Sequence, residues 1–115
     1  MEEITKIDII TRQSKLEELK SALNKIGITG MTVSQVLGCG NQKGKTEVYR
    51  GNKYTIDLLP KVKIEVVVSE VPVDLVVETA TKILNTGNIG DGKIFVYPVQ
   101  NVIRVRTGET GVKAL

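Results

Sequence analysis

Residues 61–84 read KVKIEVVVSEVPVDLVVETATKIL, and the period of hydrophobicity changes halfway along this stretch. In its first part every second residue is apolar, which predicts a β-strand over Lys61–Val68 with one apolar face. After Pro72, which is tolerated in the first turn of a helix, apolar residues recur at helical spacing, and Gly87 suits the helix end. The strand face comprises Val62, Ile64, Val66 and Val68, and the helix stripe comprises Val73, Val76, Val77, Ala80, Ile83 and Leu84.

The N-terminal part of the chain shows the same order of elements. Alternating apolar residues predict a strand over Ile4–Thr11. Ser14 and Glu17 have the spacing of a capping box, which predicts that a helix begins at Ser14, and Gly27 suits the position just past its end. A further strand is expected at about Met31–Gly40. The apolar stripe of the helix comprises Leu16, Leu19, Leu23 and Ile26.

The remaining segments complete an α+β fold. Strands are predicted over Ile94–Tyr97 and Asn101–Arg106, and the polar stretch Asn41–Asp57 is predicted as a long loop without a sustained period. Four main strands with two helices on one face give a ferredoxin-like (βαββαβ) sandwich, as a single domain over residues 1–115. The sheet face without helices needs cover, so we expect a closed homo-oligomer in which another copy supplies it.

The composition excludes several kinds of site. The chain has no His and one Cys, which excludes an intramolecular disulfide, a Cys/His zinc site and a His-based triad. No apolar run approaches the roughly 20 residues of a membrane span, so we expect a soluble, cytoplasmic protein. The net charge of +3 and the few aromatic residues favour small anionic ligands over nucleic acid.

Two glycine-rich segments are compatible with phosphate binding. Around the start of the long loop, Gly38, Gly40 and Gly44 permit close approach of the backbone to a ligand, and Lys43 adds positive charge. The second segment, Gly87–Lys93, reads GNIGDGK and joins a helix to a strand. Taken alone, the first segment is explained more simply as a plain flexible loop, and the second as a helix end followed by a turn.

A third basic feature is the pair Arg104 and Arg106. On the predicted strand these residues share one face about 7 Å apart, and an anion between them would offset their repulsion. Two surface arginines on an edge strand are the simpler explanation of the pair alone, but the three basic features together favour a polyanionic ligand. Catalysis is disfavoured because no His can activate Cys39, and only Glu65 and Asp91 remain as bases of a slow ATPase.

With these features, the chain resembles the PII nitrogen-regulatory signal proteins along nearly its whole length. The loop and C-terminal signatures are long and specific. The matching stretches are Gly27–Val33 (GITGMTV), Gln42–Gly44 (QKG), Thr46–Gly51 (TEVYRG), Leu59–Glu65 (LPKVKIE), Thr86–Val96 (TGNIGDGKIFV) and Ile103–Glu109 (IRVRTGE).

The resemblance implies a homotrimer with ATP or ADP in clefts between neighbouring subunits. The segment Gly87–Lys93 of one subunit would contact the nucleotide. Arg104 and Arg106 of the neighbouring subunit would bind the phosphates of this nucleotide. Beside ATP, Gln42 would help to hold Mg²⁺ and 2-oxoglutarate, and Lys61 would pair with a carboxylate of 2-oxoglutarate. The nucleotide site expected in this way is Thr32, Gly38, Gly40, Gln42, Lys43, Ile64, Gly90, Asp91, Gly92, Lys93, Arg104 and Arg106. The expected 2-oxoglutarate site is Gly40, Gln42, Lys43, Gly44, Lys61, Ile89 and Gly90.

The long loop, Asn41–Asp57, corresponds to the T-loop of this family. Arg50 matches the tip residue that can plug an ammonium-transporter pore, and Tyr54 matches the tyrosine that some lineages uridylylate. The resemblance thus implies a cytoplasmic regulator of nitrogen metabolism that is not an enzyme, binds no nucleic acid directly, and reaches the membrane only through a transporter. Asn41, where the family often has a basic residue, leaves open a specialised paralogue with an altered effector response and a different target.

Overall fold

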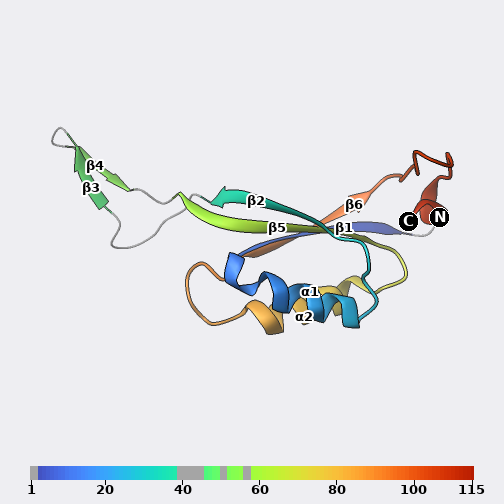
Figure 1. Cartoon of the computed structure of the whole chain (residues 1–115), viewed down its shortest axis with the longest axis horizontal. Helices are drawn as coiled ribbons and strands as arrows, with labels where there is room; N and C mark the ends of the chain where they lie inside the picture. The colour runs from blue at the N-terminus through green and yellow to red at the C-terminus, as the bar shows by residue number, and fades with distance from the viewer. Residues whose placement is uncertain (1–2, 39–45, 50–51, 56–57) are drawn as a thin grey trace.

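The computed structural model of the protein describes residues 3–38, 46–49, 52–55 and 58–115, and side chains for all of these except 46–49 and 52–55. A four-stranded sheet of order β2-β5-β1-β6 carries both α-helices on one face (Figure 1). All neighbouring strands in it are antiparallel, which confirms the ferredoxin-like fold. Its elements are β1 (Ile4–Thr11), α1 (Leu16–Lys25), β2 (Thr32–Gly38), β5 (Leu59–Val68), α2 (Val73–Leu84) and β6 (Lys93–Val99).

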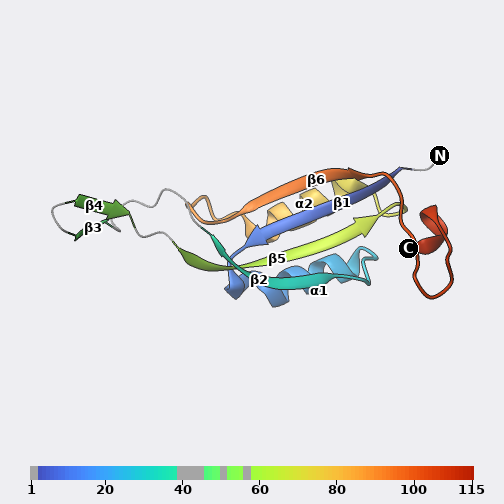
Figure 2. The ribbon, with the colours of Figure 1, turned by 90° about the horizontal axis from the view of Figure 1, so that it is seen from above.

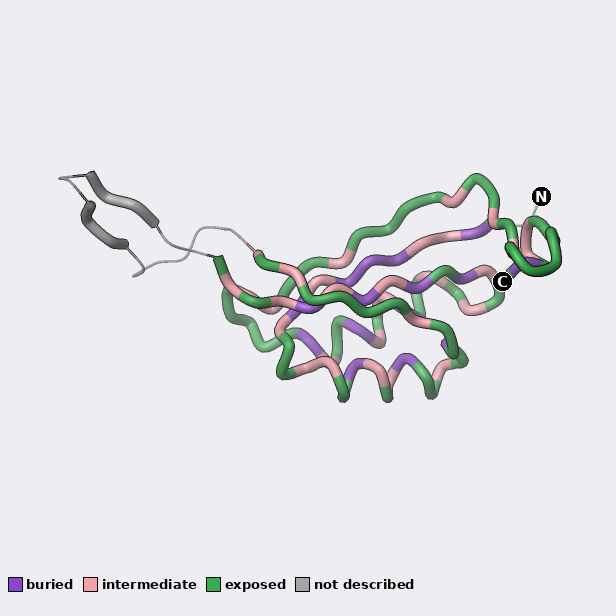
Figure 3. Tube along the Cα trace, turned by 45° about the horizontal axis from the view of Figure 1, so that its top comes forward, coloured by how far each residue is buried: buried purple, intermediate pink, exposed green. Residues whose placement is uncertain are grey.

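The core lies between the sheet and the helices, and the buried segments follow the two central strands (Figure 3). The register pairs Ile7 with Val66 and Ile9 with Ile64, so these four side chains point to the same face. All of them are at most 1% exposed. The predicted stripes of the helices are confirmed, because their central residues are buried against this face: Leu19, Leu23, Val76, Ala80 and Leu84.

The two ends of α1 differ in how well the sequence predicts them. The expected capping box does not form, because a 3₁₀ turn at Gln13–Lys15 precedes α1 and leaves Lys15 at the cap position without a side-chain hydrogen bond. At the other end, Gly27 has a φ of 103° and its amide donates to the carbonyl of Asn24. The next amide, of Ile28, donates to the carbonyl of Leu23, which completes the Schellman arrangement expected of a glycine here.

The strand predicted over Asn101–Arg106 is absent from the described residues, which corrects the sequence analysis. The segment makes one isolated bridge, between Ile103 and Thr110, and does not join the sheet. Instead, the amide of Arg104 donates to the carbonyl of Glu109 and the amide of Gly108 donates to the carbonyl of Arg104. The chain therefore turns back on itself at Gly108, where φ is 74°, before a 3₁₀ helix at Gly111–Ala114.

The stretch predicted as one long loop contains a short antiparallel hairpin of β3 (Thr46–Tyr49) and β4 (Asn52–Thr55). Both segments contain threonine and tyrosine, and β3 also contains valine; these residue types favour extended backbone. Four-residue strands are too short for a periodic pattern to reveal, so the sequence analysis missed them. Within the described residues, no helix combines the length and the apolar character needed to cross a lipid bilayer.

The sheet face without helices is less apolar than we expected. Its centre holds an ion-pair cluster of Lys6, Asp8, Lys63 and Glu65, in which each lysine contacts both carboxylates at 3.1–3.8 Å. Glu65, at 3.1 Å from the ammonium, raises the pKa of Lys63 above its ordinary value. Apolar side chains at the sides of this cluster remain partly exposed, and they are Val67, Phe95 and Tyr97.

Candidate functional site

The glycine loop, residues 87–92, is folded around the carboxylate of Asp91. Oδ2 of Asp91 accepts hydrogen bonds from the backbone amides of Thr86 at 2.7 Å and Gly87 at 3.0 Å, and Oδ1 accepts one from the Thr86 hydroxyl. The Thr86 hydroxyl foremost, and then these amides, stabilise the ionised carboxylate and lower the pKa of Asp91 below its ordinary value. The side chain of Asp91 therefore organises the loop itself.

Three consecutive carbonyl groups of the loop accept hydrogen bonds from side chains at the ends of β1 and β5. Arg12 Nη2 donates to the carbonyl of Ile89 at 2.8 Å, Lys61 Nζ to that of Gly90 at 3.1 Å, and Thr11 Oγ1 to that of Asp91 at 2.8 Å. In a planar trans peptide the N–H points opposite to the C=O. Of the amides that follow these carbonyls, that of Asp91 donates to the carbonyl of Asn88 at 3.4 Å. The amides of Gly90 and Gly92 face away from the strands, as in backbone nests that bind anions.

Two glycines of the loop are required by its geometry. Gly90 and Gly92 have φ values of 101° and 113°, which L-residues rarely adopt. A Cβ added at Gly92 would overlap the carbonyl oxygen of Ile10, which belongs to the backbone of β1 and cannot give way easily. A Cβ added at Gly90 would come within 3.1 Å of Arg12 Nη2. The loop thus lies so close to the strands that only glycine fits at these two positions.

Several residues of the predicted site lie together at this end of the sheet. An added Cβ at Gly38 would contact Lys61 Cγ at 3.1 Å, so Gly38 lies against the stem of the lysine that holds the loop. Lys93 begins β6 directly after Gly92 and pairs with Ile10. By register, Lys61 and Lys93 belong to the sheet face without helices. The sequence analysis missed Thr11 and Arg12, whose only signal was their place at the end of a strand.

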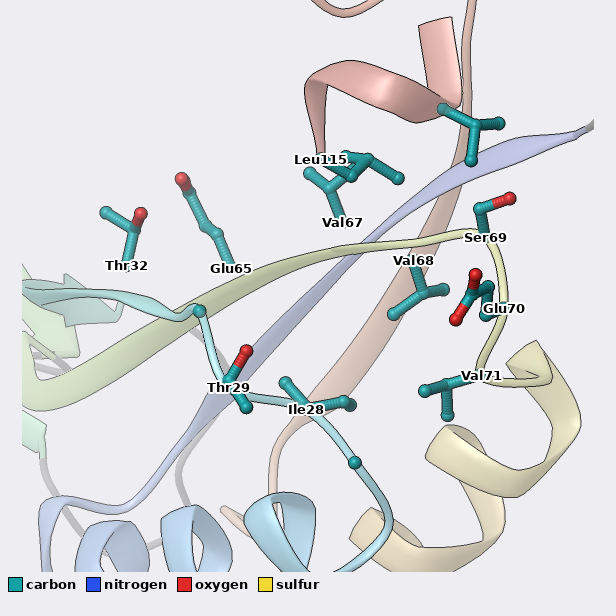
Figure 4. Close-up of a pocket in the computed structure, with 13 residues that line it drawn as sticks. Ile28, Thr29, Thr32, Glu65, Val67, Val68, Ser69, Glu70, Val71 and Leu115 are labelled. Atoms are coloured by element: carbon teal, nitrogen blue, oxygen red, sulfur yellow. The ribbon is translucent and has the colours of Figure 1, made fainter. Parts of the chain in front are cut away.

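Thr32, the first residue of β2, lies beside a groove of about 500 Å³ (Figure 4). The register pairs Thr32 with Glu65, and Val67 and Leu115 line the same groove. A groove of this volume is in the range of small-molecule sites. The sequence analysis considered Glu65 only as a base and did not select Val67 or Leu115. Ile64, in contrast, is fully buried beneath the helices, and its side chain does not reach either part of the site.

The two arginines do not share a strand face. Arg104 forms an ion pair with Glu109 at 3.3 Å, and its Nη2 donates to the carbonyl of Leu115 at 2.8 Å. Arg106 is exposed, and among the described residues no ion pair involves it. The turn at Gly108 separates the two side chains by bringing Glu109 back to Arg104. The expectation that both arginines point the same way from a strand is therefore wrong.

The predicted site also includes residues that cannot be placed. Gly40, Gln42, Lys43, Gly44 and Arg50 lie outside the described residues. The backbone of Tyr54 belongs to β4, but its side chain lies outside the described part of the structure. Among the described residues, no group of three or more cysteine and acidic side chains could hold a metal ion.

Comparison with known proteins identifies relatives along almost the whole chain. The family model described as "Nitrogen regulatory protein P-II" matches residues 4–109. The nitrogen regulatory PII-like protein of Bacillus subtilis (strain 168) is 54% identical over 110 residues, which cover 96% of this chain and 95% of the relative. The nitrogen regulatory protein P-II 1 of Escherichia coli (strain K12) is 57% identical over 104 residues, which cover 90% of this chain and 93% of the relative.

Solved structures agree with the sequence relatives. The structure of the B. subtilis GlnK–ATP complex has a TM-score of 0.80 and 51% identity, and the match covers 98% of this chain and 96% of that one. A second structure of B. subtilis GlnK has a TM-score of 0.79 and 52% identity, with 98% and 99% coverage. Sequence, fold and the glycine loop all agree, and the chain belongs to the P-II nitrogen regulatory protein family.

Proposed function

We propose that this protein is a PII-type signal transduction protein, which binds ATP or ADP and 2-oxoglutarate and regulates nitrogen metabolism through its T-loop. The glycine loop carries this proposal, because three of its carbonyls are tied to the strands and the amides of Gly90 and Gly92 face outward, where phosphate oxygens can accept hydrogen bonds. The related B. subtilis GlnK is described as a complex with ATP.

The nucleotide site is shared between copies of the chain. The glycine loop and Lys93 lie at the start of β6, whereas the segment with Arg104 and the C-terminal 3₁₀ helix follows its other end (Figure 2). The seven residues of β6 span about 20 Å, which is longer than a triphosphate. One chain therefore cannot place both clusters on the same phosphates. A neighbouring copy can supply the second cluster, so we propose a homotrimer with one nucleotide in each of three clefts.

The dicarboxylate site adjoins the nucleotide. Lys61 supplies the charge for one carboxylate of 2-oxoglutarate, and the backbone at Ile89 and Gly90 lies beside its ammonium. The first glycine segment, with Gln42, completes this site in the proposal. Mg²⁺ is commonly held by few protein ligands together with substrate phosphates, which fits a site where Gln42 is the protein ligand. The metal would bring the nucleotide and 2-oxoglutarate together.

The T-loop, residues 41–57, is the proposed output segment. Effectors at its base change which of its conformations is favoured, and each conformation presents a different surface to a target protein. Arg50 is the proposed contact with an ammonium transporter or another target, and Tyr54 is the proposed modification site. The protein acts in the cytoplasm in this proposal.

Hydrolysis of ATP has little support from the geometry. The carboxylate of Asp91 is engaged by Thr86 and Gly87, and Glu65 is paired with two lysines. The oxygens of both carboxylates are therefore engaged by groups of the protein rather than by a water molecule. Neither is free to act as a general base, so we propose a binding protein.

Titration calorimetry tests the proposal with ATP, ATP plus Mg²⁺, and ATP plus Mg²⁺ and 2-oxoglutarate. We expect Lys93→Gln to weaken ATP binding about tenfold, because a charge-assisted hydrogen bond contributes about 1.5–3 kcal/mol. Lys82→Gln is the matched control, because it removes the same charge from the exposed side of α2. Wild-type protein that binds no nucleotide, or equal losses in both variants, would contradict the proposed site.

A further inference from the structure

Arg12, which follows β1 directly, holds the glycine loop at two points. Its Nη2 donates to the carbonyl of Ile89 at 2.8 Å, and its Nη1 lies 3.7 Å from Oδ1 of Asp91. Gly90 lies between these two points, and a Cβ added to it would lie 3.1 Å from Nη2 of Arg12. The planar guanidinium makes both contacts at once, whereas the ammonium of a lysine is a single point of charge.

One contact of Arg12 is to the backbone of the loop and the other is to a side chain of the loop. One fixes a carbonyl, and the other fixes the carboxylate that binds the amides of Thr86 and Gly87. Arg12 therefore acts on the conformation of the loop, while the outward amides remain open to a ligand. Lys61 holds the loop from the adjacent strand by a single hydrogen bond, to Gly90. An ammonium has three donors, so Lys61 can keep this hydrogen bond and bind a carboxylate as well.

We propose that Arg12 is a positioning residue: it holds the glycine loop in the conformation that presents its amides to phosphate. This inference rests on the proposed function and extends it to a residue outside the proposed ligand contacts. The loop lies between the phosphates on one side and Lys61 with its dicarboxylate on the other. A loop held by Arg12 therefore couples the two ligands. Without Arg12, only the hydrogen bonds from Lys61 to Gly90 and from Thr11 to Asp91 hold the loop to the strands.

The test compares Arg12→Met, Arg12→Lys and a matched control, Lys15→Gln. Met keeps much of the length of the side chain without donors, and Lys keeps the charge but only one contact. Lys15 is a half-buried residue whose ion pair is with Glu18 of α1. The first readout is hydrogen exchange of the Thr86 and Gly87 amides in the protein without ligand. We expect about tenfold faster exchange in Arg12→Met, about threefold in Arg12→Lys, and no change in the control.

The second readout is ATP affinity, with and without Mg²⁺ and 2-oxoglutarate. We expect about tenfold weaker ATP binding in Arg12→Met. We also expect 2-oxoglutarate to increase the affinity for ATP by a smaller factor in this variant, and a general loss of stability would not change that factor. Wild-type exchange in a folded Arg12→Met or Arg12→Lys protein would overturn the proposal. Faster exchange with unchanged ATP affinity would also overturn it. Wild-type protein that binds no ATP would contradict the proposed function instead, and the exchange rates would still decide whether Arg12 holds the loop.

Discussion

Substitution of Gly92 by alanine tests the close approach of the glycine loop to β1. The new Cβ would overlap the carbonyl oxygen of Ile10, and the residue would keep a φ of 113°. The unfavourable backbone conformation costs about 1–3 kcal/mol, and forcing the backbone apart costs about another 1–3 kcal/mol. We therefore expect a loss of about 2–6 kcal/mol from the free energy of unfolding.

Gly87→Ala is the matched control for this experiment. Gly87 also has a positive φ, 80°, but a Cβ added there has no heavy atom within 4 Å. This variant therefore carries the backbone strain without the overlap, and the difference between the variants isolates the contact with Ile10. We expect that difference to be about 2 kcal/mol.

Urea unfolding of both variants at one protein concentration measures the difference. With an m value of about 2 kcal/mol per molar, about 2 kcal/mol corresponds to a midpoint about 1 M lower in Gly92→Ala than in Gly87→Ala. A fixed concentration matters because assembly contributes to the apparent stability. Equal midpoints would refute the argument, since they would mean that the loop can move away from β1 at no cost.

Four further predictions concern the ligands, the loop and the target. Folding lowers the pKa of Asp91, so its ionised carboxylate stabilises the folded protein above the ordinary pKa of 3.8, and this stabilisation is lost as the pH falls through the folded pKa. Amide exchange at Thr86 should accelerate there, and Asp91→Asn should remove this pH dependence. Arg104→Ala should weaken ATP binding about tenfold by calorimetry, and unchanged affinity would exclude it from the site. Titration should show 2-oxoglutarate binding only with Mg²⁺ and ATP present, and equal binding to the free protein would contradict the shared site. Arg50→Ala should abolish binding to an ammonium transporter in a pull-down while ATP affinity is unchanged, and loss of ATP binding would show that the T-loop is not a separate output.

The core could be predicted because its pattern is local. Every second residue of β5 between Val62 and Val68 is buried, as the alternation indicates, and the predicted bounds of β1 are the observed ones. Caps and terminal strands are harder to predict from such patterns. Ser14 and Glu17 have capping-box spacing, but the hydroxyl of Ser14 has no role at the cap because a 3₁₀ turn forms first. The alternation around Arg104 does not reveal that Glu109 is its partner.

The site depends on contacts between distant parts of the chain, which explains what the sequence analysis missed. The hydrogen bond from Thr11 to the carbonyl of Asp91 joins residues 80 positions apart. Arg12 similarly reaches Ile89 across 77 positions. Glycine content indicates that Gly87–Gly92 is unusual, but it does not identify which side chains hold the loop. The proposed ligand contacts could therefore be selected from sequence more readily than the side chains that hold the loop.

The ion-pair cluster on the sheet face without helices constrains how this protein can change during evolution. Its four members carry two positive and two negative charges, and the side chain of Asp8 is 3% exposed although it lies at the centre of an uncovered face. Loss of either lysine would leave a surplus carboxylate there, and loss of either carboxylate would leave a surplus ammonium, each with little water around Asp8 to compensate. Substitutions at Lys6, Asp8, Lys63 and Glu65 should accordingly be accepted in pairs of opposite charge. These positions should then vary together among related chains, even though they are far apart in the sequence.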